Sequence, residues 1–360
     1  MHPKSDALLL APEIFATDGG IARILRLYLK ALCETAGTES RVHLVALNDS
    51  LVDSTELRKY STSRLADWRV CGRSKRDFIT TTLRMGRQVD RVVCGHVAQL
   101  PVAWAASKLN SRMEYYLVAH GIEVWRPFTL LERRALKGAR RIFCVSDYTR
   151  QQLLGHCPLP EGRAVVLPNA LDPHLAPKVV RPASETAPII LSISRLSIAD
   201  GYKGINHLIA AIPEVLEAIP EARLRIVGRG DGLVRLQAQV AKLKIGKAVQ
   251  FTGFRSDQEL NEDLDSCRIF ALPSRKEGFG LVYLEAMAHG RPCLGARSGG
   301  VPEVITPGTG ELIEYGDVHA ISTALIAGLR RKWDIKAILD RAAEFSYLRF
   351  KGRLASLLLE

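Results

Sequence analysis

The sequence predicts an α/β protein made of two successive domains, each with a parallel sheet. Three observations carry this prediction. Short apolar runs alternate with longer segments of helical periodicity, a proline-rich break interrupts the alternation near the middle, and 360 residues exceed what one hydrophobic core usually organises. A hydrophobic content of 47% with 24% charged residues excludes a wholly disordered chain. No apolar run reaches the ~18 residues that a membrane-spanning helix needs.

The first half opens with a buried strand at 7–10 and a helix at 21–33, on which apolar residues recur at helical spacing. Strands that alternate with helices predict a parallel sheet covered by helices on both faces. Further strands of this half are expected at 42–47, 92–94, 115–119, 142–145 and 165–167.

Four prolines within 171–188 predict a linker, after which the alternation resumes. We therefore expect a first Rossmann-like domain over 1–178 and a second over 186–340. Ligands of such sheets bind at the carboxyl ends of the strands, so a cleft between facing strand ends should hold the site. The second half is expected to contain strands at 189–193, 224–227, 249–251, 269–272 and 293–296, and helices at 206–218, 232–243, 258–264, 281–289 and about 337–359.

The net charge of +12 is concentrated in the first half, where residues 1–178 hold 26 Lys and Arg against 17 Asp and Glu. Residues 58–91 alone hold ten basic residues and three acidic ones. Such a segment fits nucleic acid, anionic lipid or a phosphorylated substrate, or is only a solvated surface. Nucleic-acid binding would call for interleaved aromatic residues, and this segment has only Tyr60, Trp68 and Phe78, without stacking periodicity.

The seven cysteines are odd in number, scattered and without a CxxC pair. This pattern is typical of a reduced, cytoplasmic protein and does not indicate a disulfide framework or a zinc site. The short apolar stretch near the N-terminus is not typical of a secretory signal.

The segment 273–285, PSRKEGFGLVYLE, carries the most chemical information. Glu277 precedes Gly278 and Gly280 directly after a strand, and a helix is expected from Leu281. The free N–H groups at such a helix start suit a diphosphate or sugar hydroxyls. Glu285 lies in an otherwise apolar stretch, where vicinal ribose hydroxyls would supply its donors. On spacing alone, a Glu285–Arg pair with Glu277 as a helix cap is equally open.

The run EGFGLVYLE at 277–285 resembles the E-x7-E signature of retaining GT-B glycosyltransferases of family GT4. The resemblance implies two Rossmann-like domains with the active site between them, an N-terminal domain that takes the acceptor, and a last helix at about 341–360 that packs back on that domain. Further motifs of the family follow in order along the chain: Gly19-Gly20, His120-Gly121, SDYT at 146–149, LPNALD at 167–172, Ser194–Leu196 with Lys203-Gly204, IVGRG at 226–230, FTG at 251–253 and SGGVPE at 298–303.

The resemblance also implies roles for these residues. Arg195 and Lys203 would hold the donor's diphosphate, because fixed cations stabilise the charge that develops on a leaving phosphate. His120 would hydrogen-bond the transferred sugar, and Glu285 would bind the ribose. Glu277 with the amides of Gly278, Phe279, Gly280 and Leu281 would hold sugar hydroxyls, and the loop of Gly19 and Gly20 would reach the donor phosphates.

Two positions depart from the family pattern. Ala170 stands where glycine is common, which would cost ~1 kcal/mol if the position required φ > 0. The gap between Arg195 and Lys203 is longer than the family minimum, with Asp200-Gly201 inserted.

The implied activity is that of a retaining hexosyltransferase that forms an α-linkage in bacterial-type polysaccharide or glycolipid synthesis. The acceptor would be a saccharide or a polyprenyl-diphosphate-linked sugar. No cofactor and no metal are expected, since two cations can replace a divalent ion. VAHGIEVW at 118–125 resembles the HGxEVW of some mannosyltransferases acting on lipid acceptors, which favours GDP-mannose over UDP-glucose or UDP-GlcNAc.

Other proteins of the same shape remain alternatives. A GT-B-fold sugar-nucleotide epimerase or an inverting transferase would share the fold, but neither would be expected to carry Glu277 and Glu285 at this spacing. The non-enzymatic alternative is a basic nucleic-acid-binding protein. With a transferase, the basic segment 58–91 is expected to attach peripherally to an anionic surface on the inner face of the plasma membrane, and no nucleic acid is expected as a partner.

Overall fold

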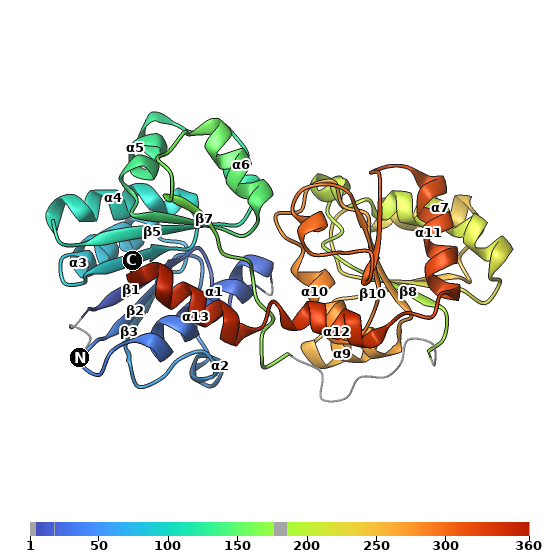
Figure 1. Cartoon of the computed structure of the whole chain (residues 1–360), viewed down its shortest axis with the longest axis horizontal. Coiled ribbons are helices and arrows are strands. Elements are labelled where there is room, and N and C mark those ends of the chain that lie inside the picture. Colours follow the sequence, from blue (N-terminus) through green and yellow to red (C-terminus); the bar gives the residue numbers. More distant parts are fainter. Residues whose placement is uncertain (1–4, 18, 176–185, 360) are drawn as a thin grey trace. The chain divides into compact units, whose positions relative to one another are not determined.

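The computed structural model describes residues 5–17, 19–175 and 186–359, and it divides into two compact units (Figure 1). Unit 1 comprises Met1–His174 and Ser346–Glu360, and unit 2 comprises Leu175–Phe345. Each unit holds one parallel sheet between two layers of helices. The expected linker at 171–188 falls partly outside the described residues.

The sheet of unit 1 has seven strands in the order β3-β2-β1-β4-β5-β6-β7, and every neighbouring pair is parallel. Its central strands are buried on both faces, which is why they appear in the sequence as unbroken apolar runs. The strands are β1 (Ala7–Ala11), β2 (Val42–Ala46), β3 (Leu65–Val70), β4 (Arg91–Cys94), β5 (Glu114–Ala119), β6 (Arg141–Cys144) and β7 (Ala164–Val166).

Helices cover both faces of this sheet. One face packs on α3, α4 and α5, and the other on α1 and α13 (Figure 1). The C-terminal helix is held on α1 by an edge-to-face contact of Phe350 with Tyr28, whose ring centroids are 5.0 Å apart. The helices of unit 1 are α1 (Gly20–Thr35), α2 (Ser54–Lys59), α3 (Lys75–Gly86), α4 (Leu100–Leu109), α5 (Leu130–Gly138), α6 (Asp147–His156) and α13 (Tyr347–Leu359), with 3-10 turns η1 (Val97–Gln99) and η2 (Ile122–Val124).

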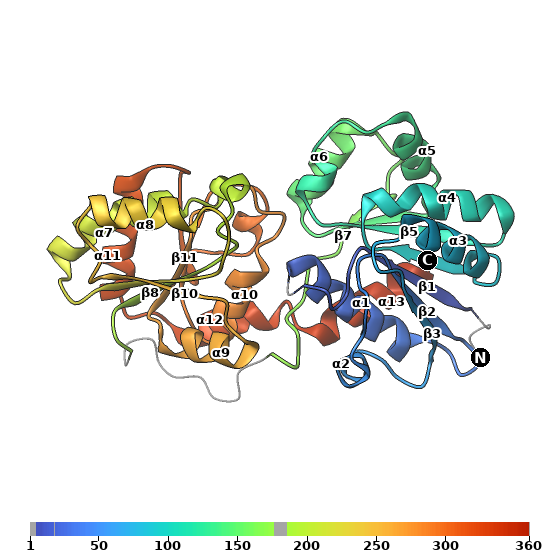
Figure 2. The same ribbon diagram turned by 180° about the vertical axis from the view of Figure 1, so that it is seen from behind.

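The sheet of unit 2 has six parallel strands in the order β10-β9-β8-β11-β12-β13. Helices α7, α8 and α11 cover one face, and α9, α10 and α12 the other (Figure 2). The strands are β8 (Ile189–Ile193), β9 (Arg223–Val227), β10 (Val249–Gly253), β11 (Ile269–Leu272), β12 (Cys293–Ala296) and β13 (Gly310–Ile313); the helices are η4 (Ile198–Lys203), α7 (Ile205–Ala218), α8 (Leu233–Lys242), α9 (Asp257–Ser266), α10 (Leu281–Ala288), η5 (Val301–Glu303), α11 (Val318–Arg330) and α12 (Ile335–Ala343).

Each sheet has one point at which the direction of winding reverses. In unit 2 the reversal lies between β8 and β11, and in unit 1 between β1 and β4. The loops that leave two such strands diverge, and this opens a crevice at their carboxyl ends where ligands of α/β sheets bind. The predicted residues Arg195, Lys203 and Glu277 lie in the β8 and β11 loops, at the reversal point of unit 2.

The structure adds elements that the sequence did not predict. Strands β3 and β13 form edges of the two sheets, and the stretch expected as one helix near 337–359 is two helices, α12 and α13, with a break at 344–346. Ala170 does not have a positive φ. Among the described residues, the non-glycine residues with positive φ are Arg73 and Lys244. The alanine therefore costs no backbone strain at this turn.

Candidate functional site

Lys203 and Glu277 form an ion pair at the reversal point of unit 2. Lys203 Nζ lies 2.7 Å from Glu277 Oε2, and both side chains are only 17% exposed. Lys203 ends η4 after β8, and Glu277 belongs to the loop after β11. Since this carboxylate binds Lys203 and the residue before α10 is Gly280, Glu277 is not the N-cap of α10. The structure thus brings together two residues that lie 74 positions apart in the sequence.

Gly204 explains how closely the two loops approach. Its φ of +76° lies in the left-handed region, and a Cβ at this position would sit 2.3 Å from the carbonyl oxygen of Pro273. Any side chain here would push the β8 loop off the β11 loop. Lys203 and Gly204 therefore act together: Gly204 allows the β8 loop to approach the β11 loop, and Lys203 then reaches Glu277.

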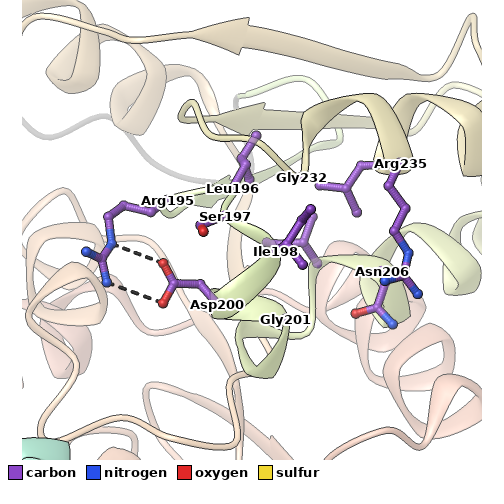
Figure 3. Close-up of a pocket in the computed structure, with 11 residues that line it drawn as sticks. Arg195, Leu196, Ser197, Ile198, Asp200, Gly201, Asn206, Gly232 and Arg235 are labelled. Atoms are coloured by element: carbon purple, nitrogen blue, oxygen red, sulfur yellow. Dashed lines mark hydrogen bonds and ion pairs between the residues drawn. The ribbon is translucent and has the colours of Figure 1, made fainter.

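Arg195 lies near the start of the β8 loop and pairs with Asp200 (Figure 3). Arg195 Nε is 3.2 Å from Asp200 Oδ2, and Nη2 is 3.3 Å from Oδ1. The arginine side chain is 77% exposed, whereas the carboxylate is largely buried. The pair forms one end of a cavity of about 250 Å³, which Arg235 and Asn206 border at the other end (Figure 3).

Tyr202 connects the cations of this edge. Its hydroxyl donates to Asp200 Oδ1 at 2.8 Å, and its carbonyl accepts from the backbone N–H of Arg275 in the β11 loop, also at 2.8 Å. The ammonium groups of Lys203 and Lys276 lie 5.7 and 5.9 Å from the centre of its ring. Burial, followed by the neighbouring Asp200, raises the pKa of Tyr202 to about 12, so the hydroxyl remains a donor at neutral pH. The edge is therefore more cationic than the predicted pair alone.

The glycine-rich loop places backbone groups at the same edge. Gly280 precedes α10 with φ +94°, and a Cβ there would sit 2.4 Å from the ring of Tyr283. Leu281 begins α10, as predicted, with Gly278 just before the turn. Phe279 is buried against Phe345, with ring centroids 5.5 Å apart, so only its backbone is available to a ligand. The side chain of Phe279 is a support of the loop and not a ligand-binding group.

Glu285 lies on the second turn of α10 and is half-buried between Leu284 and Ala286, which are both fully buried. Glu277 and Glu285 thus belong to the same loop-and-helix segment, as their spacing predicts.

An exposed aromatic residue at the neighbouring strand ends was not predicted. Phe254 follows β10 directly and is 55% exposed, and the guanidinium of Arg229, which follows β9, lies 5.0 Å above its ring. Arg229 is the arginine of the IVGRG motif at 226–230, and Phe254 directly follows the FTG motif at 251–253. A large aromatic directly after the strand glycine was the signal available.

His120 follows β5 in unit 1 and is fixed on two sides. Its Nε2 lies 2.8 Å from the carbonyl oxygen of Gly95, and its backbone N–H donates to Glu123. A ring whose Nε2–H donates to a carbonyl presents a lone pair at Nδ1 when it is neutral. Burial, opposed by Glu123, lowers the pKa of His120, which favours this neutral form.

His96 is a second histidine at the carboxyl ends of the unit 1 strands, and no sequence motif points to it. It follows β4, the strand beside β5, and the carbonyl of its neighbour Gly95 binds His120. Its Nδ1 accepts from the backbone N–H of Ala98 at 3.1 Å, so the neutral ring carries its proton on Nε2. Both neutral rings are therefore the same tautomer, with the proton on Nε2, but His96 leaves its Nε2–H donor available whereas His120 leaves its Nδ1 acceptor available.

Gln99, in the turn that follows His96, is only 4% exposed, and neither polar atom of its carboxamide has a partner among the described residues. Such a buried amide normally costs ~1–3 kcal/mol unless water or a ligand satisfies it. This residue is a further candidate that sequence reasoning did not select.

Gly19 and Gly20 lie where the sequence places them, at the start of α1. Gly19 is the N-cap, Gly20 is the first helical residue, and both are exposed. A Cβ at Gly20 would meet no atom within 4 Å. The preceding loop is held by Asp49, whose carboxylate accepts the backbone N–H groups of Ile14, Phe15 and Ala16.

Two of the family motifs have structural roles. Ser146 of SDYT caps α6 by accepting the backbone N–H of Thr149 at 3.1 Å. Asp172 of LPNALD accepts from the Tyr60 hydroxyl at 2.6 Å, which ties the end of unit 1 to its core. In these contacts both motifs position the backbone.

The described residues contain neither a metal-binding cluster nor a helix that could span a membrane. In that part of the chain, no three His, Cys, Asp or Glu residues gather in a way that could hold a metal ion. Nor is any helix there both long and apolar enough to cross a bilayer.

Comparison with known proteins identifies the family. Residues 19–175 match Glycosyltransferase Family 4, and residues 178–343 match Glycosyl transferases group 1. The chain is therefore a glycosyltransferase of the retaining family GT4, which separates it from the epimerase and the nucleic-acid-binding protein considered above.

Relatives with curated names agree on the class. The chain is 32% identical over 262 residues, 67% of each chain, to a GDP-mannose-dependent monoacylated alpha-(1-6)-phosphatidylinositol monomannoside mannosyltransferase of Corynebacterium glutamicum. It is 34% identical over 170 residues to N-acetyl-alpha-D-glucosaminyl L-malate synthase of Bacillus anthracis, which covers 47% of this chain and 43% of that enzyme.

The fold is GT-B. The Anabaena protein Alr3699/HepE, solved in complex with UDP and glucose, superposes with a TM-score of 0.80 at 19% identity, covering 99% of this chain and 100% of that one. At this identity the likeness establishes the fold, which agrees with the two parallel sheets described above.

Proposed function

We propose that this glycosyltransferase moves a hexose from GDP-mannose to a saccharide or lipid-linked acceptor and forms an α-linkage. The observation that carries the proposal is the cationic edge of unit 2, where Arg195 and the Tyr202 hydroxyl both contact Asp200, and Lys203 lies over the Tyr202 ring and contacts Glu277. GDP-mannose as donor is supported by the HGxEVW run at 120–125 and by the Corynebacterium relative, whose name specifies it.

Departure of the nucleotide is the step that this edge serves. When the bond between the sugar and the diphosphate lengthens, negative charge grows on the leaving phosphate. Arg195 and Lys203 would stabilise that charge, and they supply the positive charge for which other transferases use a divalent ion. The leaving phosphate would accept the proton of the acceptor hydroxyl on the same face of the sugar.

Acidic groups and backbone amides would hold the rest of the donor. Glu277 and the N–H groups around Gly278 and Gly280 would bind sugar hydroxyls. Glu285 would accept hydrogen bonds from both hydroxyls of the ribose. Phe254 with Arg229 offers a flat, cationic surface suited to stacking of the base.

Unit 1 would supply the remaining contacts. The Nδ1 of His120 would accept a hydrogen bond from a hydroxyl of the transferred sugar, while its Nε2 stays hydrogen-bonded to the carbonyl of Gly95. The exposed amides at Gly19 and Gly20 would face a phosphate. The acceptor, a saccharide or polyprenyl-diphosphate-linked sugar, is proposed to bind this unit.

A donor panel tests the proposal. GDP-mannose, UDP-glucose and UDP-GlcNAc would each be added to the purified protein, and both the rise in Tm and the slow hydrolysis of the donor would be measured. Stabilisation and hydrolysis with GDP-mannose alone are expected. A response only to a UDP-sugar would show that the donor is that UDP-sugar and not GDP-mannose. The Bacillus relative, an N-acetylglucosaminyl enzyme by name, is a reason to include UDP-GlcNAc in the panel. No response to any of the three would contradict the proposal.

Site variants provide a second test. Alanine at Arg195 or Glu285 is expected to abolish transfer while the Tm stays within ~2 °C of the parent, because neither residue lies in the hydrophobic core. Near-normal turnover in either variant would contradict the assigned roles.

Peripheral attachment to a membrane is proposed for the basic segment 58–91. Most of its basic residues are exposed, and the exposed apolar side chains of Trp68 and Ile79 lie among them. Each well-placed cation contributes ~1 kcal/mol at an anionic bilayer. Sedimentation with anionic and neutral vesicles at low salt tests this, and equal binding to both would refute it.

A further inference from the structure

Arg195 owes its orientation to a residue that the family motifs do not contain. Its side chain is 77% exposed, and a side chain so exposed samples many rotamers unless a partner fixes it. The partner here is Asp200, which lies in the inserted part of the loop between Arg195 and Lys203. Asp200 binds the Nε and Nη2 side of the guanidinium.

Asp200 is itself fixed from several directions. It is 9% exposed, and the Tyr202 hydroxyl donates to its Oδ1 at 2.8 Å. The segment that carries it is anchored at both ends, because Asp231 accepts the backbone N–H of Ile198 at 2.9 Å and Arg275 donates to the carbonyl of Tyr202. The position of the Asp200 carboxylate is therefore well defined, and its contact with Arg195 restricts the orientation of the guanidinium.

The contact leaves a free side on the guanidinium. Arginine presents its N–H groups in a rigid planar fork. Asp200 faces Nε and Nη2, so the N–H groups of Nη1 and the second one of Nη2 point away from the carboxylate. Those groups can bind a phosphate oxygen without breaking the pair with Asp200 (Figure 3).

We propose that Asp200, held by Tyr202, is a positioning residue that orients the guanidinium of Arg195 toward the leaving phosphate. The inference rests on the proposed function, since it takes the diphosphate as the ligand of Arg195. Asp200 acts through Arg195 and touches no substrate. The inserted part of the loop thus contributes a residue that orients Arg195.

The proposal has an unusual signature, because Asp200 carries the same sign of charge as the ligand. Its removal leaves Arg195 free to move, which lowers kcat by roughly 10- to 100-fold if orientation matters in the transition state. Its removal also takes away a charge that repels the diphosphate, so GDP should bind as tightly as before or more tightly. A general loss of structure would instead weaken both properties.

The experiment compares Asp200→Ala with Glu217→Ala, which removes a carboxylate from an exposed position on α7. Hydrolysis of GDP-mannose, or of the UDP-sugar that the donor panel selects, gives kcat and KM. Titration calorimetry with the matching nucleoside diphosphate gives Kd. Asp200→Ala should lower kcat with Kd unchanged or decreased, and Glu217→Ala should change neither. A parental kcat, or a parallel loss of kcat and diphosphate affinity, would overturn the proposal.

Two further variants keep the test decisive if Asp200→Ala is unstable. Tyr202→Phe keeps the ring beside Lys203 but removes the donor to Asp200, and should lower kcat less than Asp200→Ala does. Asp200→Asn keeps the shape and one acceptor, and should retain more activity than the alanine variant. Parental kcat in both variants would overturn the proposal.

A double-mutant cycle separates this inference from the proposed function. If Asp200 acts only through Arg195, then adding Asp200→Ala to Arg195→Ala should change the residual rate by less than about twofold. Full activity of Arg195→Ala would refute the role of Arg195 itself, and with it the proposed function. An inactive Arg195→Ala beside a fully active Asp200→Ala would refute only the positioning role.

Discussion

The ammonium group of Lys203 lies 2.7 Å from the carboxylate of Glu277, and both side chains are largely withdrawn from water. Each charge offsets part of the other's cost of burial. A donor that binds the cation through phosphate and the anion through sugar hydroxyls would keep both charges satisfied as the contact rearranges. The pair is therefore consistent with a site that is assembled before its ligand arrives.

Glu277→Gln should separate these two partners. The variant keeps the shape of the side chain but leaves Lys203 with a weaker partner, so GDP or UDP should bind more tightly. The neutral amide is a weaker acceptor for the sugar hydroxyls than the carboxylate, so kcat/KM for donor hydrolysis should fall roughly 100-fold or more. Titration calorimetry and hydrolysis kinetics measure the two effects. A variant with parental kcat/KM would show that Glu277 makes no contact in the transition state.

Gly204→Ala should be costly, since the new methyl group would meet the carbonyl of Pro273 on a backbone of positive φ. A loss of about 1–3 kcal/mol in the stability of unit 2 is expected, together with a fall in activity as Lys203 moves. Gly201→Ala in the same loop is the matched control, because a Cβ there meets nothing within 4 Å. Equal unfolding curves for the two variants would contradict this account of the loop.

Gln99→Leu should stabilise unit 1. It replaces a buried carboxamide that has no partner among the described residues by an apolar group of similar size, with an expected gain of about 1 kcal/mol. Thermal unfolding measures it, with the exposed Gln88→Leu as the control. If the carboxamide binds the acceptor or the sugar, the KM for that substrate should rise in the same variant. An unchanged or lower Tm would mean that water already satisfies the group.

The two histidines at the β4 and β5 ends make stability depend on pH. Burial lowers the pKa of both His96 and His120 below the ordinary value of about 6.5, so the unfolded chain takes up these protons first as the pH falls. The stability linked to their neutral forms is complete above about pH 7 and is lost as the pH falls through 6.5 toward the folded-state values.

Unfolding at pH 7.5 and 5.5 checks this dependence. The parent protein should lose more stability between these two pH values than the variants His96→Gln and His120→Asn do. His319→Gln, which changes an exposed histidine, should behave like the parent. If all four proteins lose the same stability, the origin of the dependence lies elsewhere.

Phe254→Ala should weaken the binding of GDP or UDP by roughly tenfold, because base stacking on an aromatic ring contributes about 1–3 kcal/mol. Phe254→Trp should preserve binding. Val234→Ala removes another exposed apolar side chain of unit 2 and serves as the control. Unchanged affinity in Phe254→Ala would place the base away from this ring.

The predicted strands include every interior strand of the two sheets and the edge strands β7 and β10. Parallel strands covered on both faces are mostly apolar, so runs such as 189–193 and 269–272 match the structure to the residue. The two edge strands that were not predicted, β3 and β13, lack this signature. In β3, four consecutive residues are exposed, and β13 is a short run that begins with a glycine, so neither has a continuous apolar pattern.

The candidate site divides in the same way. Arg195, Lys203, Glu277 and Glu285 were identifiable because each belongs to a local motif. Residues that act through a fold-dependent neighbour had no such signal. His96 gains meaning only when the order of the sheet places β4 beside β5. The contact of Asp200 with Arg195 depends on the path of a loop that no periodicity describes.

The segment that completes unit 1 comes from the far end of the chain. Helix α13 covers Tyr28 with Phe350, and Lys351 binds Glu34 at 2.9 Å. During synthesis, residues 1–174 therefore leave the ribosome well before helix α13, the last part of their core, has been made. A fragment that stops there would expose an apolar strip and aggregate, whereas a circular permutant that joins 346–359 ahead of residue 5 would give this lobe as an independently folding protein.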